Sequence, residues 1–73
     1  MMIKVKTLTG REIELNVEGT FLIQQVKEKL EELEGIPPPQ QRLIFNGRQM
    51  VDDKSLDELD IKQGCTLHLV LSL

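Results

Sequence analysis

The stretch MMIKVKTLTGREIELNV, residues 1–17, decides the fold. Apolar and polar residues alternate over residues 1–6, break at residues 7–10, and alternate again over residues 12–17. Alternation with a period of two is typical of a strand that buries one face. The two runs predict a β-hairpin, because the Gly10 between them can adopt the positive φ that tight turns require.

A helix is predicted next, over residues 22–34. Its apolar positions recur at helical spacing and are Ile23, Val26, Leu30 and Leu33. Thr20 is a candidate N-cap, because a threonine hydroxyl can accept a hydrogen bond from the first helical turn. Gly35 is the expected C′ residue, and the prolines at 37–39 prevent the helix from continuing.

The rest of the chain adds three strands. Residues 40–45 and 48–50 form a second hairpin, because Asn46-Gly47 is a strong signal for a two-residue turn. Residues 51–64 are mostly polar and hold one helical turn at most, whereas residues 66–71 alternate as a final strand. The predicted order is β-β-α-β-β-β, an α+β fold in which a mixed sheet packs on one helix.

Length and composition limit the function. The 73 residues allow one domain, residues 1–73, and 40% of them are hydrophobic, as in soluble globular proteins. Cys65 is the only cysteine and His68 the only histidine, which excludes an internal disulfide and a Cys/His zinc cage. We expect no metal and no cofactor. A lone cysteine and an N-terminus without a signal segment favour the cytoplasm and nucleus.

Charge and motifs exclude further classes. The net charge of −3 and the pI of about 5.0 argue against a nucleic-acid partner, which would require a basic stripe. No apolar run approaches the roughly 20 residues of a membrane span, so we expect no membrane partner. The sequence has no glycine-rich phosphate loop, and Cys65 and His68 fall on opposite phases of one strand. We therefore expect a protein that is not an enzyme.

Two strands carry apolar residues in the phase that should face solvent. Ile44 lies in the outward phase of the third strand, and His68 and Val70 lie in the outward phase of the last. Leu8, in the first hairpin turn, has no phase that would bury it. If the strands are neighbours, these residues form one exposed apolar patch, with basic residues around it: Lys6, Arg42 and Arg48.

This patch has two interpretations. Single exposed apolar residues are common and need no functional explanation. A cluster of apolar residues rimmed by charge usually marks a partner-binding surface, which is the interpretation we favour. Neither interpretation involves catalysis, because nothing near His68 in the sequence supplies a nucleophile or a second metal ligand.

Three segments, residues 1–10, 34–44 and 66–71, resemble ubiquitin and its nearest relatives. The resemblance covers the whole chain and implies the β-grasp (ubiquitin-like) fold. Within the family the chain is most similar to the neddylation (Rub-type) branch, at Lys4, Glu12, Glu14, Glu28, Glu31, Glu32, Pro39, Met50 and Lys54. Leu56 instead resembles ubiquitin, and Leu59 replaces a tyrosine common to both.

The resemblance implies a modifier that is joined to lysines of target proteins by an isopeptide bond. Its expected partners are activating, conjugating and ligase enzymes, cullin-type targets, deconjugating proteases and ubiquitin-like receptors. Ser72 matches the site by which activating enzymes choose their modifier, where ubiquitin has arginine and the neddylation modifier alanine. A second apolar patch is expected at Ile36, Leu71 and Leu73, and lysines for chain linkage at Lys6, Lys27 and Lys29.

The end of the chain keeps alternatives open. A conjugated modifier needs a flexible tail that ends in Gly-Gly, and this sequence ends at Leu73 without it. One alternative is a ubiquitin-like domain of a larger adaptor that is never conjugated and docks on proteasome or ubiquitin receptors. Another is a divergent ubiquitin.

Overall fold

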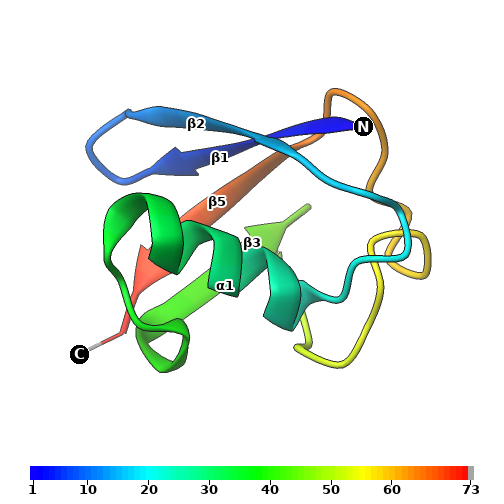
Figure 1. Cartoon of the computed structure of the whole chain (residues 1–73). Coiled ribbons are helices and arrows are strands. Elements are labelled where there is room, and N and C mark those ends of the chain that lie inside the picture. Colours follow the sequence, from blue (N-terminus) through cyan, green and yellow to red (C-terminus); the bar gives the residue numbers. More distant parts are fainter. Residues whose placement is uncertain (73) are drawn as a thin grey trace.

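The computed structural model describes residues 1–72. One helix, α1, lies across one face of a five-stranded sheet (Figure 1). The elements are β1 (Met2–Thr7), β2 (Glu12–Asn16), α1 (Ile23–Glu34), the 3₁₀-helix η1 (Pro38–Gln40), β3 (Gln41–Phe45), β4 (Arg48–Gln49) and β5 (Thr66–Leu71). The predicted order of strands and helix is confirmed, with η1 added before β3.

The strands lie in the order β2-β1-β5-β3-β4. The first and last strands of the chain, β1 and β5, are parallel neighbours at the centre, and every other pair is antiparallel. The sheet is therefore mixed, as predicted. Because β5 lies between β1 and β3, both halves of the chain share one sheet and one core.

The core lies between the sheet and α1. The inward phases of the strands and the apolar stripe of the helix supply most of it, and the sequence pattern identified these positions correctly. The buried apolar residues are Ile3, Val5, Ile13, Leu15, Val17, Ile23, Val26, Leu30, Leu43, Met50, Leu56, Ile61, Leu67 and Leu69.

The helix differs from the prediction at both ends of its apolar stripe. Leu22, not Thr20, is the N-cap, and its backbone N–H donates to Gln25 Oε1 at 2.8 Å. The helix begins there because Leu22 also forms an isolated bridge with Ser55, which fixes the chain just before it. Leu33 is not a core residue: 58% of it is exposed, because it lies at the margin of the face of α1 that Ile23, Lys27 and Leu30 bury.

Two turns are confirmed by their dihedral angles. Gly35 ends α1 with φ 74°, and its N–H donates to the carbonyl of Glu31. Asn46 and Gly47 have φ 53° and 76°, as the predicted two-residue hairpin turn requires. The second hairpin is shorter than predicted, because Gln40 belongs to η1 and Met50 leaves the strand to enter the core.

Residues 51–64 contribute more to the fold than their polar composition indicated. Leu56 and Ile61 are fully or almost fully buried, and the N–H of Ile61 donates to the carbonyl of Leu56. A single helical turn is present, as predicted, since the N–H of Leu59 donates to the carbonyl of Ser55. Within residues 1–72, no helix is long and apolar enough to cross a membrane.

Candidate partner-binding surface

The outer face of the sheet, which α1 does not cover, carries one row of side chains from four strands. Lys6 of β1 is paired with His68 of β5, His68 with Ile44 of β3, and Ile44 with Gln49 of β4. His68 is exposed and Ile44 half-buried. The strand order thus brings together residues that the sequence placed only on separate strands.

A second pair extends this row. Arg42 of β3 lies opposite Val70 of β5 and is exposed, whereas Val70 is half-buried. We call Ile44, His68 and Val70, with Lys6 and Arg42 beside them, the outer patch. Its apolar centre and two flanking cations suit a partner with an apolar side chain next to a carboxylate.

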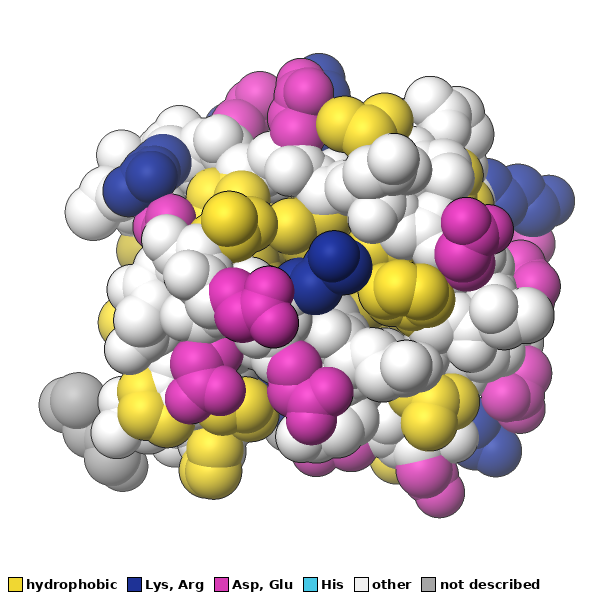
Figure 2. All heavy atoms as spheres, viewed as in Figure 1, with side chains coloured by type: hydrophobic (Ala, Val, Ile, Leu, Met, Phe, Trp, Pro, Cys, Tyr) yellow, Lys and Arg dark blue, Asp and Glu magenta, His cyan; other side chains and the backbone are white. Residues whose placement is uncertain are grey.

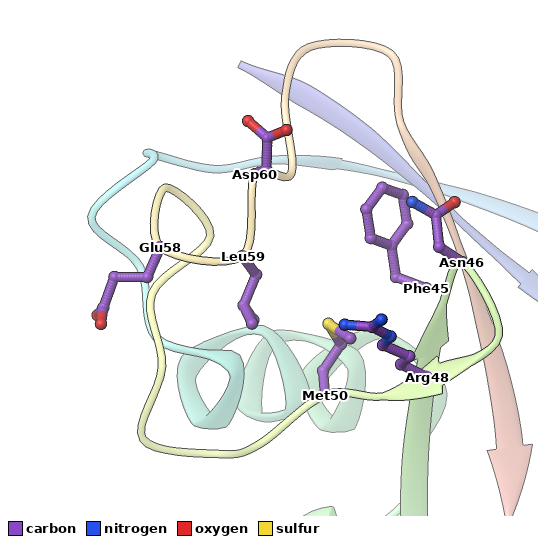
Figure 3. Close-up of a pocket in the computed structure, with 7 residues that line it drawn as sticks. All are labelled: Phe45, Asn46, Arg48, Met50, Glu58, Leu59 and Asp60. Carbon is purple, nitrogen blue, oxygen red and sulfur yellow. The ribbon is translucent and has the colours of Figure 1, made fainter.

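Arg48 does not lie in this row. Its strand partner is Phe45, so it has the opposite phase to Ile44 and Gln49. It lines a separate pocket of about 570 Å³, together with Phe45, Met50 and Leu59 (Figure 3). Gln49 is the neighbour of Ile44 that our sequence reasoning missed, although a two-residue turn at Asn46-Gly47 fixes this pairing.

Leu8 contributes to the second patch as well as being a predicted member of the first. It is 82% exposed and lines a groove of about 270 Å³ with Ile36 and Leu71, the two described members of the expected second patch. Leu73, the third member, lies outside the described residues. Leu8, Ile36 and Leu71 therefore line one groove, and the place of Leu8 in the outer patch stays a prediction.

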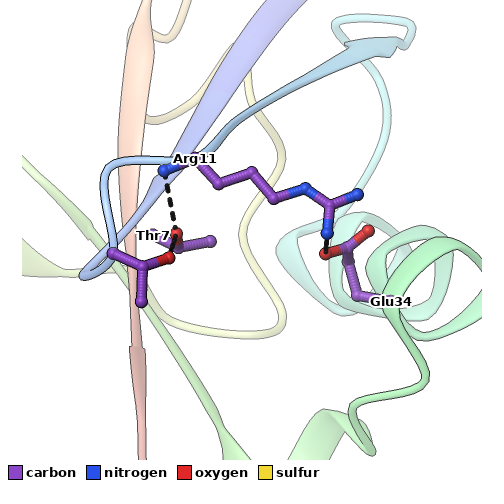
Figure 4. Close-up of polar contacts among 4 residues, drawn as sticks. Thr7, Arg11 and Glu34 are labelled. Carbon is purple, nitrogen blue, oxygen red and sulfur yellow. Dashed lines mark hydrogen bonds and ion pairs between the residues drawn. The ribbon is translucent and has the colours of Figure 1, made fainter.

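An ion pair closes one side of this groove. Arg11 Nη1 lies 3.1 Å from Glu34 Oε1, and both residues line the groove (Figure 4). The N–H of Arg11 also donates to Thr7 Oγ1 at 3.2 Å. These contacts connect the β1–β2 turn to the C-terminal end of α1, so the turn that carries Leu8 is held beside Ile36.

The three lysines expected as linkage sites differ in access. Lys6 is exposed and Lys29 half-buried. The side chain of Lys27 is only 7% exposed, and its Nζ lies 2.5 Å from Asp52 Oδ1. An amine in a buried ion pair is a poor nucleophile until the structure opens locally, so Lys27 is the least accessible of the three.

Ser72 is held against β3 where the chain leaves the sheet. Its N–H donates to the carbonyl of Gln40 at 2.7 Å, and Arg42 Nη2 donates to Ser72 Oγ at 3.3 Å. The residue at the expected selectivity position is therefore neutral and lies directly beside a guanidinium of the outer patch.

Cys65 and the acidic side chains are the groups that could act as a nucleophile or bind a metal ion. Cys65 Sγ accepts a hydrogen bond from the Lys62 N–H at 3.3 Å, and no base is paired with it within residues 1–72. That part of the chain also holds no group of three or more His, Cys, Asp or Glu side chains placed to bind a metal ion.

Comparison with known proteins agrees with this geometry. Residues 3–73 match the ubiquitin family. The chain belongs to the ubiquitin family. It is 62% identical to the ubiquitin-like protein NEDD8 of Dictyostelium discoideum and 51% identical to the NEDD8-like protein RUB1 of Saccharomyces cerevisiae, over the whole of this chain and 95% of each relative.

A third relative of this ubiquitin-family chain differs in architecture. The AN1-type zinc finger protein 4 of Mus musculus is 44% identical over the whole chain, which covers 10% of that longer protein. The full-length matches to NEDD8-type proteins make the chain a NEDD8-like ubiquitin-like modifier, and such modifiers are not themselves enzymes.

Proposed function

We propose that this protein is conjugated, through a C-terminal Gly-Gly tail, to lysines of target proteins of the cullin type. Activating, conjugating and ligase enzymes supply the chemistry, and deconjugating proteases reverse it. The observation that carries this proposal is the outer patch. Ile44 and His68 are adjacent on the face that α1 leaves uncovered, and an apolar cluster flanked by charged residues on such a face usually marks a partner-binding surface.

The contacts at Ser72 support the choice of the neddylation pathway over the ubiquitin pathway. A small hydroxyl hydrogen-bonded to Arg42 brings no positive charge, so an activating enzyme with an acidic pocket for position 72 gains nothing from it. An enzyme that accepts a small neutral residue there is the better fit.

The proposed partners bind through defined parts of the surface. The outer patch contacts receptors and enzymes, while the groove of Leu8, Ile36 and Leu71 contacts enzymes that approach the tail. Lys6 and Arg42 steer acidic partners, and Arg48 does so from the adjacent pocket. Lys6 and Lys29 are the proposed linkage lysines. Such interfaces are small and transient. We place these encounters in the cytoplasm and nucleus.

The first test of the proposal is the intact mass and C-terminal sequence of the native protein. A chain that ends in Gly-Gly shortly after Leu73 has the carboxylate that activation requires. The second test offers this form to the neddylation and ubiquitin activating enzymes. We expect thioester formation with the former, and a shift toward the latter for Ser72→Arg. Charging by the ubiquitin enzyme alone would instead identify a divergent ubiquitin.

A second candidate function is that of a docking domain within a longer adaptor. It is favoured by the match to the mouse AN1-type zinc finger protein, in which the similar segment makes up a tenth of the chain. In that case the outer patch docks on proteasome or ubiquitin receptors without conjugation. A native chain that runs on into another domain would support this function and exclude the first.

A further inference from the structure

The pocket that Arg48 lines lies apart from the outer patch and has room for a ligand. Its volume of about 570 Å³ falls within the range of small-ligand sites. We call it the Arg48 pocket. Its apolar walls are Phe45, Met50 and Leu59, and its polar residues are Asn46, Arg48, Glu58 and Asp60. A pocket of this size can hold one side chain of a partner together with the polar groups attached to it.

The apolar walls lie at the margin of the core. Phe45 has the same phase on β3 as the buried Leu43, so it lies on the side of the sheet that carries α1. Phe45 and Leu59 pack against the core but remain half-buried, whereas Met50 is almost fully buried. In Figure 3 the three apolar side chains surround the pocket. An apolar group of a ligand would therefore complete a part of the core that the chain leaves partly open.

Backbone contacts hold these walls in place. The Met50 N–H donates to the carbonyl of Leu43 at 2.8 Å, and the Leu59 N–H donates to the carbonyl of Ser55 at 3.1 Å. Phe45 ends β3 and is paired with β4. The pocket is therefore formed before a ligand arrives, which spares the ligand the entropic cost of ordering it.

The two carboxylates of the pocket already have partners of their own. Glu58 Oε1 accepts a hydrogen bond from the Ser55 N–H at 3.2 Å, and Glu58 Oε2 lies 3.9 Å from Lys54 Nζ. Figure 3 shows the Glu58 carboxylate pointing away from the pocket. Asp60 Oδ1 lies 3.2 Å from Lys62 Nζ. Neither lysine lines the pocket, so both negative charges are compensated from outside it.

The one cation that lines the pocket has no such partner. Arg48 forms no ion pair within residues 1–72. Its guanidinium lies beside Met50 and points toward Leu59 in Figure 3. A guanidinium binds a carboxylate through two parallel hydrogen bonds, and a single positive charge matches a single negative one. The Asn46 side chain, also in the lining, offers a donor and an acceptor to a peptide group beside that carboxylate.

Other places on the surface suit an apolar anion less well. On the side that carries α1, acidic side chains lie beside the exposed apolar ones (Figure 2) and would repel a carboxylate. Arg11 is ion-paired with Glu34, and Arg42 donates to Ser72 Oγ. Of the three arginines of the chain, Arg48 is the one with neither kind of contact in the described residues.

We propose that the Arg48 pocket binds the C-terminal residue of a partner protein that ends in an aromatic side chain. The terminal carboxylate pairs with Arg48, and the aromatic ring packs against Phe45 and Leu59. Both groups belong to one residue, so both reach one pocket, whereas neighbouring side chains of an extended internal segment face opposite ways. The outer patch takes no part in this site, so the proposal does not depend on the function proposed above.

The probe that tests this site is the peptide acetyl-GSGF with a free C-terminal carboxylate, added to the ¹⁵N-labelled full chain and followed by NMR. We expect saturable shifts at the amides of Asn46, Leu59 and Asp60 and at Arg48 Nε. Two control peptides should bind about tenfold or more weakly, because they lack the terminal charge: acetyl-GSGF-amide, and acetyl-GEGF-amide with an internal carboxylate. Equal binding of either amide would overturn the proposal.

Matched arginine variants separate this pocket from the outer patch. Arg48→Gln should weaken probe binding about tenfold or more and should remove the preference for the free acid over the amide. Arg42→Gln makes the same change of charge on the outer patch and should leave the affinity unchanged. Leu59→Trp should weaken binding about tenfold, because the indole fills the space that the aromatic ring of the probe requires.

The remaining outcomes also decide the question. Equal losses in Arg48→Gln and Arg42→Gln would show that the probe responds only to net charge, and shifts centred on Ile44 and His68 would place it on the outer patch. Either result would overturn the proposal, as would the absence of shifts at about 10 mM probe, where a millimolar site is mostly filled. If Leu59→Trp does not fold, the arginine pair carries the test, because both arginines are exposed.

Discussion

The inner and outer faces of β3 differ in what covers them. Leu43 faces α1 and is fully buried, whereas its neighbour Ile44 faces away from the helix and remains half-exposed. Both are large apolar residues on one short strand. The difference teaches that an apolar side chain is required by the fold only on the covered face. On the uncovered face it can serve the partner binding proposed above.

The uncovered surface is itself divided. The outer patch combines apolar residues with Lys6 and Arg42 on the face of the sheet that α1 does not cover. The groove of Leu8, Ile36 and Leu71 lies where the β1–β2 turn meets the C-terminal end of α1. A domain with only one helix over one face of its sheet therefore exposes apolar side chains at two places.

The largest expected effect is on the free energy of unfolding, and it tests the difference between Leu43 and Ile44 directly. Leu43→Ala should lower the free energy of unfolding by about 2–5 kcal/mol, because it leaves a cavity in the core. Ile44→Ala should lower it by less than about 1 kcal/mol, because the side chain is already partly in water. Urea denaturation of both variants measures the difference. Equal losses would mean that Ile44 belongs to the fold.

The next largest effect on stability is expected from a substitution in the Asn46-Gly47 turn, which places Gln49 beside Ile44. Gly47 has φ 76°, and an alanine there would cost about 1–2 kcal/mol of unfolding free energy. Asn46→Gly is the control, because glycine accepts the φ of 53° at that position without strain. A Gly47→Ala variant as stable as the natural protein would exclude the described turn geometry.

Covered and uncovered lysines should differ in reactivity. Lys27, in its buried ion pair with Asp52, should be acetylated by a small reagent about tenfold or more slowly than Lys6, because reaction requires local opening. Asp52→Asn should reduce the difference between the two acetylation rates, because it weakens the ion pair that holds Lys27. Mass spectrometry of partly acetylated protein gives both rates, and equal rates in the natural protein would refute the burial of Lys27.

The smallest expected effect concerns the pKa of Glu58, in residues 51–64, where the sequence shows no regular periodicity. The pKa of the Glu58 carboxyl is lowered chiefly because the Ser55 N–H donates to Glu58 Oε1 at 3.2 Å, and the Ser55 hydroxyl and Lys54 add smaller contributions. A lowered carboxyl pKa stabilises the fold above the unfolded value of about 4.3, and this contribution disappears as pH falls through the folded pKa.

Carboxyl NMR titration checks this prediction. Ser55→Ala should raise the pKa of Glu58 only part of the way to its ordinary value, because alanine removes the hydroxyl but keeps the backbone N–H that contributes most. Glu58→Gln should remove the whole acid-dependent contribution of this group to stability. A Glu58 pKa that does not change at all in Ser55→Ala would assign the shift to the backbone N–H and Lys54 alone.

Periodicity predicted the parts of the fold in which local pattern and burial agree. The alternation at Ile3, Val5, Ile13 and Leu15 identified inward residues, and the dihedral preferences of Gly35 and Asn46-Gly47 identified turns. Leu56 and Ile61 were missed because an irregular segment has no repeating phase to mark its buried residues. Leu33 fits the helical period only loosely, because it lies at the margin of the face that the buried helix residues define.

The sequence predicted which residues of the candidate site point outward from β3 and β5, but it did not predict how they are arranged. The alternation of residues along each strand identified Ile44 and His68 as pointing outward. That they are neighbours depends on the pairing of β3 with β5, which no local sequence pattern encodes. For the same reason Leu8 was assigned to the outer patch, although the Arg11–Glu34 ion pair holds its turn beside Ile36. Arg48 lies one residue out of phase with the outer patch.

The central claim, that the outer patch binds partners, is tested most directly with Ile44→Ala. The measurement is the affinity of the neddylation activating enzyme for the natural protein, for Ile44→Ala, and for the exposed control Val51→Ala. We predict a loss of more than about 1 kcal/mol for Ile44→Ala, at unchanged fold, and no change for Val51→Ala. Unchanged affinity of a folded Ile44→Ala protein would contradict the account.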